Sequence, residues 1–158
     1  MNLEITQIDS EDAEIVAKLN SEIFRHLIVY DSRYIEEVCK KKQGYVLKVN
    51  GWIVGYVICD DCHNLVTQSS VPTIMSIGVL EKYRGHGLGK ELVRATYRLY
   101  KNCDIYLSVQ TKNLKALELY KSEKFVVIAT IKNYYNLPGG YEDAYAMVRL
   151  KEDLSNRL

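Results

Sequence analysis

Hydrophobic positions along this chain recur with two different periods. Some stretches are strand-like, with short apolar runs or alternation of apolar and polar residues, and others repeat every three to four residues, as helices packed on one face do. The strand-like stretches are residues 3–8, 45–49, 52–58, 73–79, 105–109, 125–131 and 145–150. Two helical stretches begin after Asp9 and after Asp31, and two more cover residues 88–99 and 113–122. This order predicts an α/β fold in which a mixed, mostly antiparallel sheet is flanked by about four helices.

The first two helices are expected to begin at side chains that cap helix ends. Asp9 or Ser10 precedes the first helix and Asp31-Ser32 precedes the second, and their oxygens can accept the unpaired N–H groups of a first turn. The buried face of the first helix is expected to carry Ile15, Val16, Leu19 and Ile23. The helix over residues 88–99 is expected to bury Leu88, Leu92, Val93, Thr96 and Leu99.

Residues 45–58 form the clearest local pattern, a hairpin with Asn50-Gly51 at its turn. Asn-Gly supplies the two positive φ angles that a two-residue type I′ turn requires. Residues 60–70 are polar and are expected to form a loop, as are residues 136–140. With no internal repeat and no linker-like segment, the whole chain, residues 1–158, is expected to be one domain.

Composition excludes several classes of protein. The chain has 158 residues, of which 47% are hydrophobic and 26% charged, and its formal net charge is +1. This is the composition of an ordinary globular domain, and the longest basic run, residues 40–42, is too short for nucleic-acid binding. The start of the chain carries Glu4 where a signal peptide would be basic, and its apolar runs are too short to span a bilayer. We therefore expect a cytoplasmic protein without membrane or nucleic-acid partners.

The segment Cys59-Asp60-Asp61-Cys62-His63 matches the C-x-x-C-H pattern of haem attachment. Haem attachment belongs to exported proteins, and two acids between the thiols disfavour a redox pair. The other cysteines, Cys39 and Cys103, are too distant in sequence to complete a zinc motif. We therefore expect no metal and reduced thiols.

A glycine-rich loop, Arg84-Gly85-His86-Gly87-Leu88-Gly89, joins a predicted strand to a predicted helix. Glycines let the backbone approach a ligand closely, and the positive end of the following helix attracts phosphate. The loop lacks the Gly-Lys-Ser/Thr ending of a P-loop and the G-x-G-x-x-G spacing of dinucleotide sites. By itself the pattern leaves two interpretations open, a pyrophosphate site and a turn that packs a helix closely.

The pattern Arg84-x-x-Gly87-x-Gly89 resembles the Q/R-x-x-G-x-G/A loop of the GCN5-related N-acetyltransferase (GNAT) superfamily. The resemblance extends over most of the chain, and it is strongest to the protein N-terminal acetyltransferases of the archaeal Ard, ribosomal-protein-alanine and eukaryotic types. The similar segments are residues 73–79, 83–89, 106–110, 113–120, 132–135 and 142–147. The resemblance implies the GNAT fold, acetyl-CoA as cosubstrate, and direct transfer of acetyl to the α-amine of a protein or peptide without a covalent acyl-enzyme.

The resemblance also implies a set of cofactor contacts. Backbone groups of residues 77–79 are expected to pair with the pantetheine arm as an added strand does. The residues implied to bind acetyl-CoA are Ile77, Gly78, Val79, Arg84, Gly85, His86, Gly87, Leu88, Gly89, Lys90, Asn113, Ala116 and Tyr120. Tyr120 occupies the family position of the acid that protonates the departing thiolate, a role that suits a phenol with an ordinary pKa of about 10.

The position of the general base departs from the family pattern. Thr73 stands where relatives often carry Tyr, and Ser108 stands where they carry His or Glu. Both hydroxyls can hold a water molecule, but neither is a base at neutral pH. An α-amine has an ordinary pKa of about 8, against about 10.4 for a lysine, so this departure favours α-amine acceptors. Glu22, His26 and His63 are weaker candidates for proton relay.

The family pattern places aromatic side chains around the acceptor peptide. The implied substrate-binding residues are Phe24, His26, Tyr30, Tyr134 and Tyr135. Neighbours on a strand face opposite ways, so one of the adjacent tyrosines is expected to point away from the slot. The family proline after Phe24 is replaced by Arg25, which leaves the preferred first residue open. Nascent chains at the ribosome are one possible source of acceptors.

Two other functions fit the same residues. A looser slot at Tyr134 and Tyr135 would admit small-molecule amines or lysines. A CoA-binding module without catalysis would explain the missing base at Thr73 and Ser108.

Overall fold

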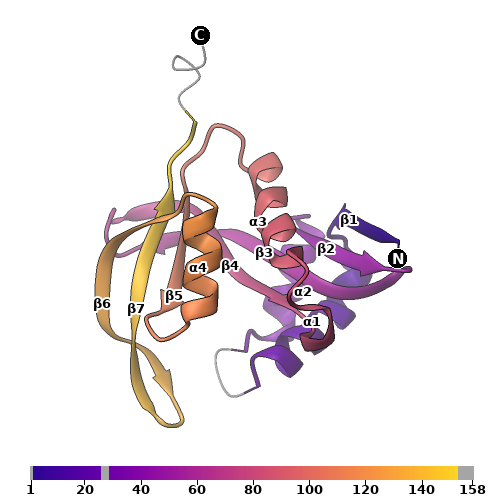
Figure 1. Cartoon of the computed structure of the whole chain (residues 1–158), viewed down its shortest axis with the longest axis horizontal. Helices are drawn as coiled ribbons and strands as arrows, with labels where there is room; N and C mark the ends of the chain where they lie inside the picture. Colours follow the sequence, from indigo (N-terminus) through magenta and orange to yellow (C-terminus); the bar gives the residue numbers. More distant parts are fainter. Residues whose placement is uncertain (1, 26–28, 153–158) are drawn as a thin grey trace.

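The computed structural model describes residues 2–25 and 29–152, which form one sheet with helices on both faces (Figure 1). Strands are assigned at β1 (Leu3–Gln7), β2 (Gly44–Val49), β3 (Trp52–Asn64), β4 (Ser69–Val79), β5 (Ile105–Gln110), β6 (Val126–Leu137) and β7 (Gly140–Arg149). The α-helices are α1 (Ala13–Ile23), α2 (Ser32–Lys40), α3 (Leu88–Leu99) and α4 (Leu114–Ser122), with short 3-10 turns at Ser10–Asp12 and Glu81–Tyr83.

The strands lie in the order β1-β2-β3-β4-β5-β7-β6. All neighbouring strands in the described residues pair antiparallel except β4 and β5, which are parallel. The parallel strands share a single registered pair, Thr73 with Tyr106. The predicted mixed, mostly antiparallel sheet with helices around it is therefore confirmed, and its two halves meet at one point of β4 and β5.

Alternation along the strands separates two hydrophobic cores. Val46 faces one core, with α1 and α2, whereas its neighbour Leu47 faces the other, with α3 and α4. Figure 1 shows the same division, with α3 and α4 on the near face and α1 and α2 on the far face. The sheet is thus buried on both sides, which explains the nearly continuous apolar sequence of β2 and β3.

Most local sequence signals have the expected structure. Asn50 and Gly51 have φ angles of 50° and 84°, as the type I′ turn requires. The Asp31 side chain accepts a hydrogen bond from the Arg33 N–H group at the start of α2. Asp9 and Asp12 form a reciprocal capping box ahead of α1.

Two predicted loops and one predicted buried residue are wrong. Residues 60–64 and 69–70 extend β3 and β4 into a long hairpin arm, in which paired backbone groups support polar side chains that the sequence pattern had placed in a loop. Residues 136–140 contain only a short turn between β6 and β7. Ile15 is 45% exposed, because α1 turns its face with Val16 and Leu19 toward the sheet. In residues 2–25 and 29–152, no helix combines the length and apolar character needed to cross a membrane.

Candidate active site

A cavity of about 960 Å³ opens where β4 and β5 separate. It is lined by Thr73 and residues 74–79 of β4, by residues 107–110 of β5, and by parts of α3, α4 and β6. The two strands pair at Thr73 and Tyr106 and then diverge, so side chains and loops, rather than a neighbouring strand, border the next part of β4. The fold itself thus leaves a groove at the middle of the sheet.

The part of β4 that borders the cavity includes Ile77, Gly78 and Val79. On its other side this segment pairs with residues 55–57 of β3. Among the described residues its cavity side has no registered strand partner, so its backbone groups can pair with an extended ligand, as sheet edges do. One of these groups is already used, because the Val79 carbonyl accepts a hydrogen bond of 2.8 Å from Nε of Arg84.

The glycine-rich loop closes one end of the cavity. Gly87 is the N-cap of α3 and has a φ angle of 73°, in the left-handed region that glycine adopts without steric cost. The first N–H groups of α3 therefore lie at the cavity wall beside Leu88 and Gly89. A helix N-terminus with exposed first N–H groups is suited to bind phosphate groups.

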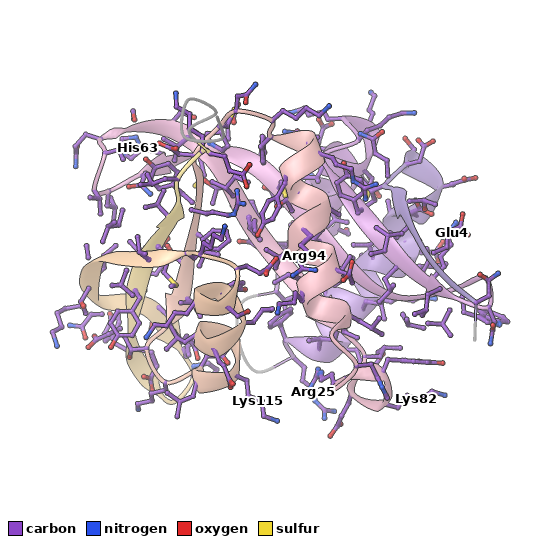
Figure 2. The ribbon with its side chains drawn as sticks, turned by 45° about the horizontal axis from the view of Figure 1, so that its top comes forward. Glu4, Arg25, His63, Lys82, Arg94 and Lys115 are labelled. Carbon is purple, nitrogen blue, oxygen red and sulfur yellow. The ribbon has the colours of Figure 1, made fainter. Side chains whose placement is uncertain are left out.

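Cations gather at the same end. Arg84, Lys90 and Lys115 line the cavity, whereas Glu118 is the one carboxylate among the described lining residues. Figure 2 shows Lys82 and Lys115 near the beginnings of α3 and α4, with Arg25 between them. His86, by contrast, is exposed and does not line the cavity, so its predicted cofactor contact has no support in this geometry.

Helix α4 carries the remaining predicted cofactor residues. Asn113 and Ala116 line the cavity, and the Asn113 side chain accepts a hydrogen bond from the Ala116 N–H group, which caps the helix. Tyr120 also lines the cavity, although only 7% of its surface is exposed. Burial raises the pKa of Tyr120 above its ordinary value, so the phenol is protonated at neutral pH.

A bulge in β4 places Tyr30 at the other end of the cavity. The β3–β4 register shifts between Ile58 and Cys59, which leaves Met75 outside the ladder. The Tyr30 hydroxyl donates a hydrogen bond of 3.1 Å to the Met75 carbonyl. Burial raises the pKa of Tyr30 to about 12. Phe24 and Tyr30 both line the cavity.

Tyr134 and Tyr135 both line the cavity, which corrects the expectation that one of them faces away. The β6–β7 register is irregular between Ile131 and Tyr135, and Asn133 has a positive φ angle of 53°. This irregularity breaks the two-residue alternation of a regular strand, and the two rings meet edge to face with centroids 4.8 Å apart. The Asp143 carboxylate supports the bulge by accepting the Asn133 N–H group at 2.8 Å.

The positions that replace the family base lie in the cavity. Thr73 donates its hydroxyl to the Val71 carbonyl at 2.8 Å, and Ser108 is exposed on the cavity wall. His63, on the hairpin arm, also lines the cavity. Glu22 does not line it, and the predicted contact of His26 lies outside the described residues.

The C-x-x-C-H segment runs along β3. Cys59 is fully buried and Cys62 is partly buried on the cavity wall. Burial raises the pKa of both thiols, with a further contribution from Asp60. In the part of the chain that the structure describes, no three His, Cys, Asp or Glu side chains come together as metal ligands.

Several cavity residues have no sequence motif. The arm residues Cys62, Asn64 and Leu65 line the cavity only because the expected loop is a hairpin. Met75 and Ser76 lie at and beside the bulge of β4. The sequence holds one sign of an unusual contact in this region. Asn20 is a polar residue on the otherwise apolar buried face of the first helix.

Known proteins share both this sequence pattern and this fold. The model of the family described as "Acetyltransferase (GNAT) family" matches residues 7–125. An N-alpha-acetyltransferase from Sulfurisphaera tokodaii is 32% identical over 113 residues, which are 65% of this chain and 66% of that protein. The matched segment is therefore slightly less than two thirds of the archaeal relative.

Two solved structures from Arabidopsis thaliana have the same fold. NAA60 in complex with a bisubstrate analogue superposes with a TM-score of 0.83 at 20% identity, over 96% of this chain and all of that one. Naa50 in complex with the bisubstrate analogue CoA-Ac-MVNAL gives a TM-score of 0.77 at 26% identity, over 94% of this chain and 98% of that one. Because the family model covers well over half of its length, the chain belongs to the GNAT family of acetyltransferases.

Proposed function

We propose that this protein transfers acetyl from acetyl-CoA to the α-amino group of protein or peptide N-termini, by direct attack in a ternary complex. One observation carries the proposal. A single cavity joins a phosphate-type loop before α3 to a group of tyrosines around the β4 and β6 bulges, and Tyr120 lines the same cavity. Tyr135 lies within electrostatic reach of Tyr120, Tyr30 and Tyr134.

The loop end suits the nucleotide part of acetyl-CoA. The N–H groups that open α3, together with Arg84, Lys90 and Lys115, provide positive charge for a pyrophosphate. The open edge at Ile77 and Gly78 can hold the amide-containing arm as an added strand. Acetyl-CoA supplies the activated thioester, and the chain positions it beside the acceptor amine.

Tyr120 is proposed as the acid of the reaction. Its hydroxyl would donate a proton to the sulfur as the carbon–sulfur bond breaks, so that the thiol rather than the thiolate leaves. Burial raises the pKa of Tyr120, which keeps the proton on the phenol until that step. Its ring packs 5.8 Å from that of Phe125, which fixes its direction.

The acceptor amine is proposed to enter between Tyr30 and the pair Tyr134 and Tyr135. Ser108 and Thr73 are proposed to hold a water molecule that removes the proton from the attacking amine. No strong base is needed if the acceptor is an α-amine, because an appreciable fraction of that amine is neutral near pH 7.5. Lysine amines are nearly all protonated at that pH, so the same site would acetylate them poorly.

The side chains at this end also indicate the first residue of the acceptor. Ile23, Phe24, Tyr30, Ile131 and Tyr134 line the cavity with apolar or aromatic surface. An apolar first side chain can be buried there, whereas a charged one would lose its hydration without an ionic partner. We therefore propose apolar first residues. We also propose a cytoplasmic location and nascent chains at the ribosome as one source of acceptors.

Mass spectrometry of acetyl transfer to matched peptides tests the function. Each peptide is offered with a free or blocked N-terminus, with or without an internal lysine, and with methionine, leucine, serine or aspartate first. The proposal expects one acetyl group on free N-termini only, with methionine and leucine ahead of aspartate. Acetylation of lysines or of added polyamines would contradict it in favour of a different amine. Binding of acetyl-CoA without any product would indicate a non-catalytic module.

A further inference from the structure

A buried polar network lies inside the apolar core between α1 and the sheet. Asn20 and Tyr56 are both 0% exposed. Nδ2 of Asn20 donates to the Tyr56 hydroxyl at 2.9 Å and to Oγ of Ser76 at 3.3 Å, and the two hydroxyl groups are themselves 2.9 Å apart. The network therefore joins α1, β3 and β4 at one point.

These bonds determine which way the Asn20 amide points. With Nδ2 held by two hydroxyl oxygens, Oδ1 faces the opposite side, where it accepts the backbone N–H of Tyr30 at 2.9 Å. The neighbouring buried positions on α1, Val16 and Leu19, are apolar, and a leucine at position 20 would fill similar space. A buried amide in such a place costs free energy unless all its polar groups are hydrogen-bonded. The benefit of Asn20 is therefore that its bonds fix the position of Tyr30.

Tyr30 is therefore held both at its backbone N–H group and at its side-chain hydroxyl. Asn20 binds its backbone, and the Met75 carbonyl at the β4 bulge binds its hydroxyl at 3.1 Å. Its ring lies 5.2 Å from the ring of Tyr34 and lines the cavity. The distance between α1 and the bulge thus sets where the Tyr30 ring stands across the acceptor end of the cavity.

We propose that Asn20, oriented by Tyr56 and Ser76, is a positioning residue that sets the acceptor slot through Tyr30. This inference rests on the proposed function, because it takes the Tyr30 end of the cavity as the place of the acceptor peptide. Asn20 itself is not in the cavity wall, so it acts through Tyr30 and not on the substrate.

Steady-state kinetics with a good acceptor peptide test the role of Asn20. For Asn20→Leu we expect the KM for peptide to rise about tenfold, as loss of hydrogen bonds to a buried backbone group implies, with kcat and the KM for acetyl-CoA within about twofold of the parent. Tyr56→Phe keeps the Asn20–Tyr30 bond but removes one of the two hydroxyl partners, so a smaller rise of about threefold is expected. This milder variant keeps the test informative if Asn20→Leu does not fold.

Val16→Ala is the matched control, because Val16 is fully buried on the same helix and belongs to the same core without joining the network. It should lower thermal stability and leave the peptide KM unchanged. Equal peptide KM values for Asn20→Leu and the parent, or an equal rise in Val16→Ala, would overturn the proposal.

Amide hydrogen exchange at Tyr30 separates this inference from the proposed function. The exchange is expected to be at least about tenfold faster in Asn20→Leu than in Val16→Ala, whether or not a peptide is acetylated. Unchanged protection of Tyr30 in Asn20→Leu would overturn the positioning role. Absence of peptide acetylation by the parent, with protection lost as expected, would instead contradict the proposed function.

Discussion

The tyrosines Tyr30, Tyr120, Tyr134 and Tyr135 line the cavity. Burial raises the pKa of Tyr30 to about 12 and raises the pKa values of Tyr120 and Tyr135 as well. All three remain neutral donors through the physiological pH range, because a phenol loses its proton only above its pKa. The cavity therefore presents protonated hydroxyls, and the proposed mechanism assigns proton removal from the amine to a water molecule held by Ser108 and Thr73.

Tyr120→Phe tests this assignment of the acid. The phenyl ring keeps the packing against Phe125, so thermal stability should change little. We expect kcat, followed by release of CoA thiol at saturating substrates, to fall about 100-fold or more, as loss of a general acid does. Tyr100→Phe removes a buried hydroxyl group outside the cavity and should leave kcat unchanged. Equal rates for Tyr120→Phe and the parent would show that Tyr120 is not the acid.

At the scale of elements, irregularities of the strands and a tight loop build the site. The bulge in β4 frees the Met75 carbonyl, and the bulge in β6 turns Tyr134 and Tyr135 toward the same cavity. Bulges often re-aim side chains next to active sites in this way. Each bulge makes a hydrogen bond to a residue of another segment, which is Tyr30 for the β4 bulge and Asp143 for the β6 bulge.

Removing the carboxylate under the β6 bulge should loosen the acceptor slot. Asp143 accepts the Asn133 N–H group, and this bond lowers the carboxyl pKa, so the support is fully present at assay pH and is lost only in acid. For Asp143→Ala we expect the peptide KM to rise about threefold to tenfold with little change for acetyl-CoA. Glu142→Ala, which removes the neighbouring ion pair with Lys112, should leave both constants unchanged. Equal effects of the two variants would contradict the role of the bulge.

Substitution of Gly87 by alanine tests the loop before α3, and the same substitution at Gly51 is a control with a similar backbone strain. Gly87 and Gly51 both have left-handed φ angles, and a Cβ at either would meet no atom within 4 Å. Alanine at each should cost about 1–2 kcal/mol of stability through backbone strain alone. We expect only Gly87→Ala to weaken acetyl-CoA binding, by about tenfold or more in calorimetry, because only that backbone lies in the cavity wall. Equal affinity of the two variants would contradict a phosphate-binding loop.

For the whole molecule, the separation of β4 from β5 is the decisive feature. It opens one cavity that reaches the nucleotide end and the acceptor end of the same site. The chain has a formal net charge of only +1, but Arg84, Lys90 and Lys115 concentrate positive charge at the nucleotide end. Local charge, rather than net charge, therefore selects a phosphate-bearing ligand.

The pH dependence of the reaction follows from the groups that the cavity brings together. With protonated tyrosines in the cavity wall, kcat/KM for an α-amine peptide should rise with pH, reach half its maximum near pH 8 and level off above about pH 9. The reason is that the substrate amine, with its ordinary pKa of about 8, must lose its proton before it attacks. His63→Asn should leave this profile unchanged. A second ionisation between pH 6 and 7 that disappears in His63→Asn would make His63 the proton acceptor.

The sequence by itself determined the local features of this protein. The Asn50-Gly51 turn, the caps at Asp31 and Asn113, and the left-handed Gly87 depend on φ angles and hydrogen bonds within a few residues. The order of strands and helices also follows from hydrophobic period, and the glycine-rich loop with its surrounding segments indicates the family.

Only the tertiary structure decided how those parts combine into a site. The hairpin arm at residues 60–70, the orientation of both Tyr134 and Tyr135, and the bond from Asn20 to Tyr30 depend on partners far away in the chain. The β4 bulge adds one residue, Met75, and the β6 irregularity sets residues 132–134 opposite Asp143 alone, so neither segment keeps the two-residue alternation that a local sequence pattern records. The role of the buried Asn20 amide likewise depends on its hydrogen-bond partners, which come from β3, β4 and the segment before α2.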